Sequence, residues 1–372
     1  MNMKYIFIAV ILTFGCAKKN VDTIADTPRV AGEFVFVSNV NTSGGALIDS
    51  VSGFNINSTT GILEFLNPLS TNVGNDPYDL IMSPDGKYLY VANSGSNSIN
   101  QFSINPYSGT LTAITPAPIS QGATPYAMAV SYDSRFLYGA NDDSPGTINQ
   151  YQIGSDGALT PLSPAKVNLP LNRAWFVTLT PDSKFLYATI YQSPGEIAMF
   201  AVNQSNGTLS PLTPATVASS NLPWHINIHP NGQFVYVTNY SSNNITAYSI
   251  NQTTGQLSLL ASSPFATQLL PVGLSIDPLG RFLYVGNSGQ SSVSIFIINT
   301  TTGALTLVGI QTVTGGAYGL EVDRTGKYLY VANHQSNTVT MLTIDQTTGL
   351  LTAMVPATIG SGTNPRFVRL RR

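Results

Sequence analysis

The chain has 372 residues, of which only 9% are charged, and its formal net charge is −2. Its surface must therefore be solvated mainly by Ser, Thr, Asn and Gln. The sparse Lys and Arg exclude nucleic acid and large anionic membrane surfaces as partners, because counterion release at phosphates requires clustered cations.

The first residues are typical of an export signal. Lys4 supplies a positive start, and residues 5–14 form an apolar stretch that is too short to span a bilayer. Cys16, the only cysteine, stands where bacterial lipoproteins are cleaved and acylated, although a Thr replaces the usual aliphatic residue three positions before it. We expect a signal peptide over residues 1–16, lipidation at Cys16 and a polar tether over residues 17–32. The alternative is a plain signal peptide with an incidental thiol.

Two patterns recur seven times after the tether. The first is EFVFVSNV (33–40), KYLYVANS (87–94), RFLYGAND (135–142), KFLYATIY (184–191), QFVYVTNY (233–240), RFLYVGNS (281–288) and KYLYVANH (327–334). The second is a Gly between turn residues and a short apolar run, at Gly61, Gly109, Gly157, Gly207, Gly255, Gly303 and Gly349. A fixed period of 46 to 50 residues indicates a repeat fold.

Each repeat resolves into short strands with turn residues between them and shows no helical periodicity. In the second repeat we expect strands over residues 77–82, 88–93 and 98–104, where Ile99, Phe102 and Ile104 mark the third, and a fourth strand over 110–114. Four strands per repeat of this length form a propeller blade. The sequence therefore predicts an all-β, seven-bladed β-propeller with four-stranded blades over residues 33–372.

The ends of the array predict how the ring closes. The first copy begins at its second strand, residues 34–39, and has no first strand before it. Residues 364–370 repeat the first-strand pattern and have no second strand after it. We therefore expect the C-terminal strand to pair into the first blade and close the ring.

Several recurring polar residues are expected to build blades or turns. The second strand ends in Asn in six blades, at Asn39, Asn93, Asn141, Asn239, Asn287 and Asn333. A feature repeated in nearly every blade favours a structural role. Asp85, Asp133 and Asp182 occupy tight turns, where Asp caps its own backbone.

The first strands of a propeller converge on its central channel, where function tends to reside. In blade order, the residues after the Pro or its equivalent are Tyr78, Tyr126, Trp175, Trp224, Val272, Tyr318 and Arg366. The residues that follow them are Asp79, Ala127, Phe176, His225, Gly273, Gly319 and Phe367. Such a circle of aromatic residues suits stacking against sugar faces, apolar ligands or a partner's side chain, and it also suits packing between blades. The candidate ligand-binding residues are Tyr78, Asp79, Tyr126, Trp175, Trp224, Tyr318 and Arg366.

Signals for metals and cofactors are weak. The three histidines are His225, His229 and His334, and the first two stand four apart on a predicted strand without a carboxylate in the motif. We expect neither a metal nor a cofactor. Glu321 and Arg369 occupy the same strand position in neighbouring blades, which suggests a buried pair that secures ring closure.

The blades, especially PWHINIHPNGQFVYVTNY (223–240) and SPDGKYLYVANS (83–94), resemble lactonase-type seven-bladed propellers. That group includes 6-phosphogluconolactonases, carboxymuconate cyclases and the related YVTN-repeat propellers. The similarity covers about residues 33–370. It implies a lactone site built from a Pro-Arg-His motif, an Asn-Glu pair that ends the following strand, and His and Arg residues in other first strands.

The polar set that the resemblance implies is largely replaced in this chain. His225 stands at the family His and is the candidate catalytic residue, but Trp224 stands for the Arg and Tyr240 for the Glu. Trp175 and Tyr318 stand where the family has His and Arg. An anionic or lactone substrate requires cationic donors and a base that activates water.

We therefore expect a non-catalytic, monomeric propeller of the bacterial cell envelope, anchored by lipid on the periplasmic side or the surface of the outer membrane. It would bind a protein or a small molecule at the mouth of its channel. The alternative is an extracytoplasmic lactone hydrolase in which His225 acts with Arg366, a lone cation at the mouth, or with the nearby acid Asp79. A purely structural or surface-coat role is the third hypothesis.

Overall fold

The computed structural model describes residues 32–41, 49–115, 119–120, 124–169 and 173–370. The predicted signal peptide, Cys16 and residues 17–31 of the predicted tether lie outside the described residues. The described part contains thirty strands and no helix, so no helical segment in it could cross a membrane.

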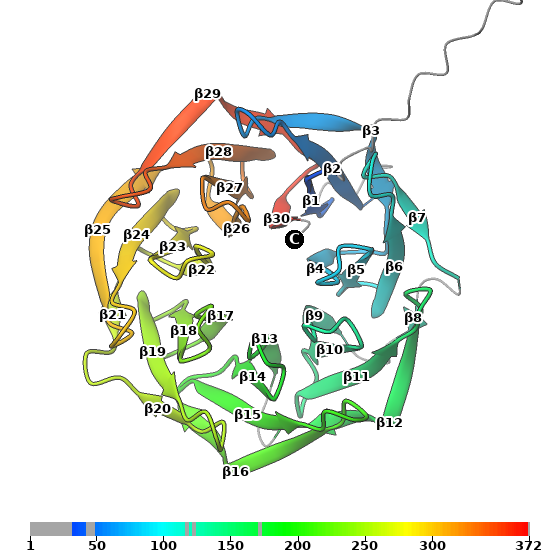
Figure 1. Cartoon of the computed structure of the whole chain (residues 1–372), viewed down its shortest axis with the longest axis vertical. Coiled ribbons are helices and arrows are strands. Elements are labelled where there is room, and N and C mark those ends of the chain that lie inside the picture. The colour runs from blue at the N-terminus through cyan, green and yellow to red at the C-terminus, as the bar shows by residue number, and fades with distance from the viewer. Residues whose placement is uncertain (1–31, 42–48, 116–118, 121–123, 170–172, 371–372) are drawn as a thin grey trace, which may run out of the picture. The chain divides into compact units, whose positions relative to one another are not determined.

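Seven antiparallel sheets stand around a common centre, and each sheet is one blade of a β-propeller (Figure 1). All of these strands belong to one compact unit, Gly32–Arg372. The predicted all-β, seven-bladed fold with four-stranded blades is confirmed.

The strands of each blade follow one another from the centre of the ring to its rim. Blade 1 consists of β30 (Pro365–Leu370), β1 (Phe34–Asn39), β2 (Ser50–Ile56) and β3 (Leu63–Asn72). Blade 2 consists of β4 (Pro77–Met82), β5 (Tyr88–Asn93), β6 (Ser98–Ile104) and a divided outer strand, β7 (Leu111–Ala113) and β8 (Ile119–Ser120). Blade 3 consists of β9 (Pro125–Val130), β10 (Phe136–Asn141), β11 (Thr147–Ile153) and β12 (Leu159–Asn168).

The remaining blades repeat this order. Blade 4 consists of β13 (Ala174–Leu179), β14 (Phe185–Ile190), β15 (Glu196–Val202) and β16 (Leu209–Ala218). Blade 5 consists of β17 (Pro223–Ile228), β18 (Phe234–Asn239), β19 (Asn244–Ile250) and a divided outer strand, β20 (Leu257–Leu259) and β21 (Phe265–Ala266). Blade 6 consists of β22 (Pro271–Ile276), β23 (Phe282–Asn287), β24 (Ser292–Ile298) and β25 (Leu305–Thr312). Blade 7 consists of β26 (Ala317–Val322), β27 (Tyr328–Asn333), β28 (Thr338–Ile344) and β29 (Leu351–Gly360).

The ring closes as the sequence predicts. The C-terminal strand β30 pairs antiparallel with β1, with Val35 opposite Leu370 and Val37 opposite Val368. The strand β30 is therefore the innermost strand of the blade to which β1 belongs.

The two recurring sequence patterns meet at the junctions between blades. The hydroxyl of Tyr236 in blade 5 donates to the carbonyl of Gly303 in blade 6 at 2.9 Å. The same bond is made by Tyr90, Tyr138, Tyr187, Tyr284 and Tyr330 to Gly157, Gly207, Gly255, Gly349 and Gly61 of the next blade. Gly303 has a positive φ of 74°, and a Cβ there would lie 2.5 Å from the ring of Phe234. The pattern thus requires a glycine at this position.

The recurring Asn and Asp residues have the structural roles expected of them. Asn287 is fully buried, and its amide donates to the carbonyl of Val285 at 3.2 Å and to the hydroxyl of Ser294 on the next strand at 3.0 Å. In the turns, Asp85 accepts a hydrogen bond from the backbone N–H of Lys87 at 3.2 Å. Asp133 and Asp182 do the same for Arg135 and Lys184.

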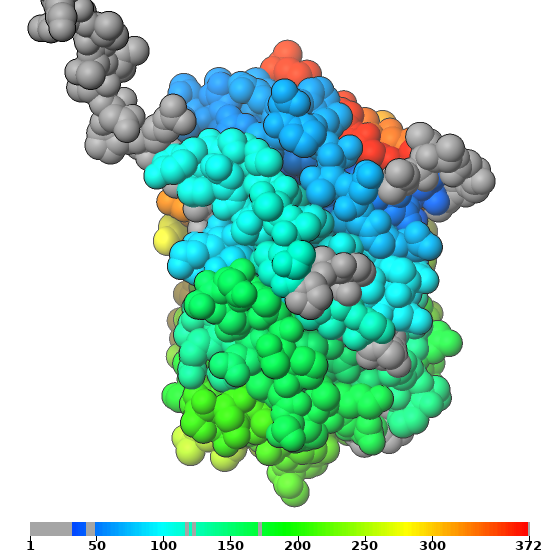
Figure 2. Space-filling view, turned by 90° about the vertical axis from the view of Figure 1, so that its right-hand side faces the viewer, coloured from blue at the N-terminus to red at the C-terminus, as the bar shows by residue number. Residues whose placement is uncertain are grey.

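The rim of the ring consists of the outer strands, whose side chains are mostly exposed. Figure 2 shows this rim from the side on which β3, β7, β8 and β12 lie. In β12, for example, the buried Leu159 is followed by residues that are largely exposed. The apolar core therefore lies between neighbouring blades and at the centre of the ring.

Candidate functional site

Two consecutive residues of each innermost strand meet at the centre of the ring. We call the first set, Tyr78, Tyr126, Trp175, Trp224, Val272, Tyr318 and Arg366, the mouth layer. We call the second set, Asp79, Ala127, Phe176, His225, Gly273, Gly319 and Phe367, the inner layer. Both sets supply members of one buried cluster. Strand alternation would send consecutive residues to opposite faces, but the register shifts at the start of the innermost strands, for instance between Pro223 and Ile226, and such a bulge re-aims side chains.

The aromatic residues of the mouth layer pack against one another. The rings of Tyr126 and Trp175 stack with centroids 4.1 Å apart, and those of Trp175 and Trp224 meet edge to face at 5.1 Å. Contacts also join blades that are not neighbours, because Trp224 of blade 5 lies 6.1 Å from Tyr318 of blade 7. The hydroxyls of Tyr78 and Tyr318 are hydrogen-bonded at 2.8 Å. The aromatic side chains therefore fill the centre of the ring at this level.

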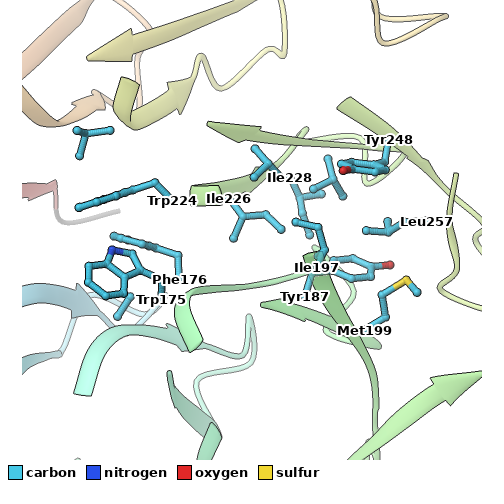
Figure 3. Packing of buried hydrophobic residues seen from close by; sticks show 14 of the residues in the cluster. Trp175, Phe176, Tyr187, Ile197, Met199, Trp224, Ile226, Ile228, Tyr248 and Leu257 are labelled. Atoms are coloured by element: carbon cyan, nitrogen blue, oxygen red, sulfur yellow. The ribbon is translucent and has the colours of Figure 1, made fainter. Parts of the chain in front are cut away.

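The mouth layer is continuous with the core between blades. Trp175 and Trp224 are each 7% exposed. Figure 3 shows how this cluster extends from Trp175, Phe176 and Trp224 at the centre outward to Tyr187, Tyr248 and Leu257 between blades 4 and 5. Packing between blades is thus one role of the aromatic residues of the mouth layer.

Three further aromatic residues lie at the mouth, and none of them is among the predicted ligand-binding residues. Tyr191 stacks on Trp175 at 4.4 Å, Tyr240 lies 4.8 Å from Trp224, and His334 lies 5.3 Å from Tyr318. All three are partly exposed, and each follows the last residue of a second strand. Aligning that position across the seven repeats would have identified them.

Arg366 is the cation of the mouth layer, as predicted. Its Nη1 donates to the hydroxyl of Tyr318 at 3.1 Å, and its guanidinium lies over the rings of Tyr78 and Tyr318 at 5.3 and 5.2 Å. A second cation, Arg173, forms an ion pair at the surface with Asp142 at 3.1 Å. Asp142 also directly follows a second strand, β10.

Three buried donors of the mouth layer have no hydrogen-bond acceptor. They are Nε1 of Trp175, Nε1 of Trp224 and Nε of Arg366. An indole or guanidinium N–H can only donate, and leaving such a group buried and unpaired costs about 1–3 kcal/mol. A bound molecule that brings acceptor oxygens to these atoms would recover that free energy.

His225 lies in the inner layer, one residue deeper along its strand than Trp224. Its ring lies 4.5 Å from Phe176 and 6.0 Å from Phe367, and its Nδ1 is buried without a partner. Burial, with a smaller contribution from the charge of Arg369, holds the pKa of His225 well below 6.5. The imidazole is therefore neutral, and no carboxylate hydrogen-bonded to it is found among the described residues.

Asp79 also lies in the inner layer and not at the mouth. It is fully buried, and its Oδ1 accepts from Nη2 of Arg369 at 3.0 Å. Arg369 lies 3.7 Å from Glu321 as well. The predicted Glu321–Arg369 pair is therefore present, but the shorter contact of Arg369 is with Asp79. Asp79 has a structural partner and is not placed to act beside Arg366.

Tyr78 and Tyr126 of the mouth layer keep their protons at neutral pH and can therefore donate hydrogen bonds. Burial is the main cause that raises the pKa of Tyr126 to about 12, and it also raises the pKa of Tyr78 well above 10. In the described part of the chain, no group of three or more His, Cys, Asp or Glu side chains is arranged to hold a metal ion. His229 is structural, because its Nδ1 accepts from the backbone N–H of Asn231 in its own turn at 3.2 Å and its Nε2 lies 2.8 Å from the carbonyl oxygen of Gly280 in blade 6.

The fold and the site define a seven-bladed β-propeller with a convergent aromatic site at the start of its innermost strands. A family model described as a lactonase with a seven-bladed β-propeller matches residues 25–119, 171–270 and 264–365. These segments make up more than half of the chain, so the protein belongs to the lactonase family of seven-bladed β-propellers. The resemblance found in the blades is confirmed.

Solved structures of similar proteins share the fold. A proposed 6-phosphogluconolactonase from Bacteroides fragilis is 24% identical, with a TM-score of 0.79 over 92% of this chain and 99% of that chain. The periplasmic gluconolactonase of Pseudomonas aeruginosa is 19% identical, with a TM-score of 0.76 and the same coverage. A proposed 6-phosphogluconolactonase from Bacteroides uniformis is 23% identical, with a TM-score of 0.78 over 91% and 99%. No curated protein sequence matches this chain significantly.

Proposed function

We propose that this protein is a non-catalytic binding propeller of the bacterial cell envelope, which holds a small, oxygen-rich ligand at the mouth of its ring. The observation that carries the proposal is the pair of indole donors, Trp175 Nε1 and Trp224 Nε1, which are buried among aromatic rings without an acceptor. A ligand with hydroxyl, carbonyl or carboxylate oxygens that enters between the side chains of the mouth layer would pair with these donors and stack on Tyr191 and Tyr240 at the mouth.

The surroundings of His225 support a binding role over hydrolysis. A general base must reach the proton that it removes and is usually oriented by a third group. His225 lies below the packed mouth layer between two phenylalanines, and the Arg and Glu of the family motif are replaced by Trp224 and Tyr240. The mouth retains Arg366 as a cation, but that side chain is engaged with Tyr318.

Intrinsic tryptophan fluorescence tests the proposal directly, because the only two tryptophans of the chain are Trp175 and Trp224. Titration with neutral sugars, sugar acids and lactones should give a saturable change for at least one class. Trp224→Phe keeps the ring but removes the donor, and it should weaken binding by about tenfold, equivalent to about 1.4 kcal/mol. Tyr132→Ala, an exposed aromatic on a distant turn, should bind as the wild type does.

The alternative function is lactone hydrolysis, which membership of the lactonase family favours. A panel of lactones should be incubated with the fragment Gly32–Arg372 and with its His225→Ala variant. We expect no turnover above buffer from either. Hydrolysis by the wild-type fragment that is lost in His225→Ala would contradict the binding proposal and establish His225 as catalytic.

The proposal includes export and a lipid anchor at Cys16, followed by a tether of polar residues. Acylation at Cys16 with two or more chains would hold the propeller at a membrane surface, whereas a single acyl chain gives only marginal, reversible binding. In a bacterial host, the wild-type protein should sediment with membranes, and Cys16→Ser should move it to the soluble fraction. Equal partitioning of the two forms would rule out the anchor.

A further inference from the structure

The outer strand of each blade has one backbone edge without a strand partner, and such edges invite pairing with another chain. Proline is common in edge strands, where it hinders pairing with another chain because it removes a backbone donor. The outer strands β3, β12, β16 and β29 contain Pro68, Pro164, Pro214 and Pro356, each where the register with the neighbouring strand shifts. Pro116 of blade 2 lies outside the described residues. In blade 5, Pro264 stands between β20 and β21. In blade 6, β25 contains no proline and is two residues shorter than those ten-residue strands, and its Ile310 is paired with Ser294 of β24.

The strand without proline, β25, also carries exposed apolar side chains. Leu307 and Ile310 of β25 are 44% and 49% exposed, and Val308 between them is exposed as well. Ile297 on the neighbouring strand β24 is 38% exposed on the other face of the sheet, because it is paired with Thr306 and not with Leu307. Leu350 of blade 7 lies against β25 on that other face, because a Cβ on Gly309, which is paired with Ile295, would lie 2.8 Å from Leu350 Cδ2. β25 lies at the rim of the ring, away from the mouth layer (Figure 1).

The charge pattern indicates what covers this edge. Residues 282–320, which include β23, β24 and β25, contain no Asp, Glu, Lys or Arg. The strand therefore offers nothing to a charged partner, and two copies of it can approach without like-charge repulsion. An antiparallel strand pair of identical sequences has a twofold axis, so each apolar contact is made twice.

We propose that β25 is a self-association edge, at which two copies of this protein pair β25 with β25 antiparallel and join their sixth blades into one continuous sheet. The pairing is weak. Eight residues span about 26 Å of strand, so the buried strip is smaller than the roughly 800 Å² per partner of a stable complex. On this proposal, dilute protein is monomeric, and pairing becomes significant where copies are concentrated, for instance on one membrane.

Sedimentation velocity of the fragment Gly32–Arg372, from low to high micromolar concentration, tests the proposal. This fragment contains all thirty described strands. The sedimentation coefficient of the wild type should rise with concentration towards that of a dimer. Ile310→Lys places a charge on the edge, and Leu307→Lys does the same at a second exposed position of β25. Both should weaken association by about tenfold or more.

The matched control is Val355→Lys on β29, an outer strand that contains a proline. Val355 is 89% exposed and directly precedes Pro356. It should associate as the wild type does, and thermal unfolding should show that all variants are folded. Hydrogen exchange should slow with concentration at the amides of β25 and not at those of β29. A wild type that stays monomeric throughout, or an Ile310→Lys variant that associates equally well, would overturn the proposal.

Discussion

His225 illustrates how the surroundings of a residue can change its chemistry. By type it is the candidate base of a lactone site, but its ring lies between Phe176 and Phe367 below a packed aromatic layer. Burial lowers the pKa of His225 well below 6.5 and, with the charge of Arg366 as a smaller cause, lowers that of His334 to about 4. Both imidazoles are therefore neutral in the folded protein at physiological pH.

These histidines predict a loss of stability in acid. Between pH 6.5 and the folded-state pKa, the unfolded chain binds more protons than the folded chain. The contribution of the two histidines to the free energy of unfolding is therefore present above about pH 6.5 and is lost as the pH falls towards 4. Asp79 acts in the opposite direction. Burial raises its pKa, so the folded state becomes more stable relative to the unfolded state when the carboxyl is protonated. We expect a net fall in the free energy of unfolding on acidification, measured by urea unfolding at several pH values.

The control for this prediction is His225→Phe, which keeps an aromatic ring between two phenylalanines and removes the titrating group. Its free energy of unfolding should depend less on pH than that of the wild type. An unchanged pH dependence would show that His225 is not the source of the acid sensitivity.

At the scale of strands, the Tyr-to-Gly hydrogen bond recurs at six blade junctions, and the junction between blades 1 and 2 lacks it. β1 has Phe36 where the other second strands have tyrosine. The rest of this junction matches the others, since a Cβ on Gly109 would lie 2.7 Å from the ring of Phe34, as one on Gly303 would meet Phe234. Blade 2 therefore packs on blade 1 without the recurring Tyr-to-Gly bond, although other polar contacts, such as that of Arg369 with Asp79, join these two blades.

This difference predicts opposite effects for two matched substitutions. Tyr236→Phe removes the donor to the carbonyl of Gly303 and should lower the free energy of unfolding by about 1 kcal/mol. Phe36→Tyr should supply the missing bond to the carbonyl of Gly109 and raise it by up to about 1 kcal/mol. Tyr107→Phe, which changes an exposed ring, should have little effect. Destabilisation by Phe36→Tyr would show that the first junction has no space for the hydroxyl.

At the scale of the whole molecule, the closing strand is held from both sides. Arg369 on β30 of blade 1 contacts Asp79 of blade 2 at 3.0 Å and Glu321 of blade 7 at 3.7 Å. Its Nε also donates to the carbonyl of Leu80 at 3.1 Å. One side chain thus links three blades at the point where the ring closes.

Removing the strand or its ion pair should destabilise the entire propeller. Deletion of residues 364–372 exposes β1 and opens the ring, and an unchanged melting temperature would refute closure as a stabilising element. Arg369→Met leaves Asp79 buried without its partner and should cost about 3–5 kcal/mol of unfolding free energy. Adding Asp79→Leu to that variant removes the buried carboxyl that has lost its cation, and it should restore part of the lost free energy of unfolding, as measured by chemical denaturation.

The sequence by itself determined the number of blades, the position of their strands and the closing role of residues 364–370. These features follow from local patterns, such as KYLYVANS and the turn before each Gly, whose meaning is reinforced by seven repetitions. It also identified the aromatic residues of the mouth layer, because their place after the Pro of each first strand is a fixed position in the repeat.

Only the tertiary structure decided what those residues contact. The depth of His225, the pairing of Asp79 with Arg369, and the unpaired indole donors of Trp175 and Trp224 depend on strands up to 290 residues apart converging at one axis. Tyr191 and Tyr240 join the site for the same reason. Side chains meet there through the geometry of the ring, in which the size of each residue sets the space left for the others, and no local pattern encodes that balance.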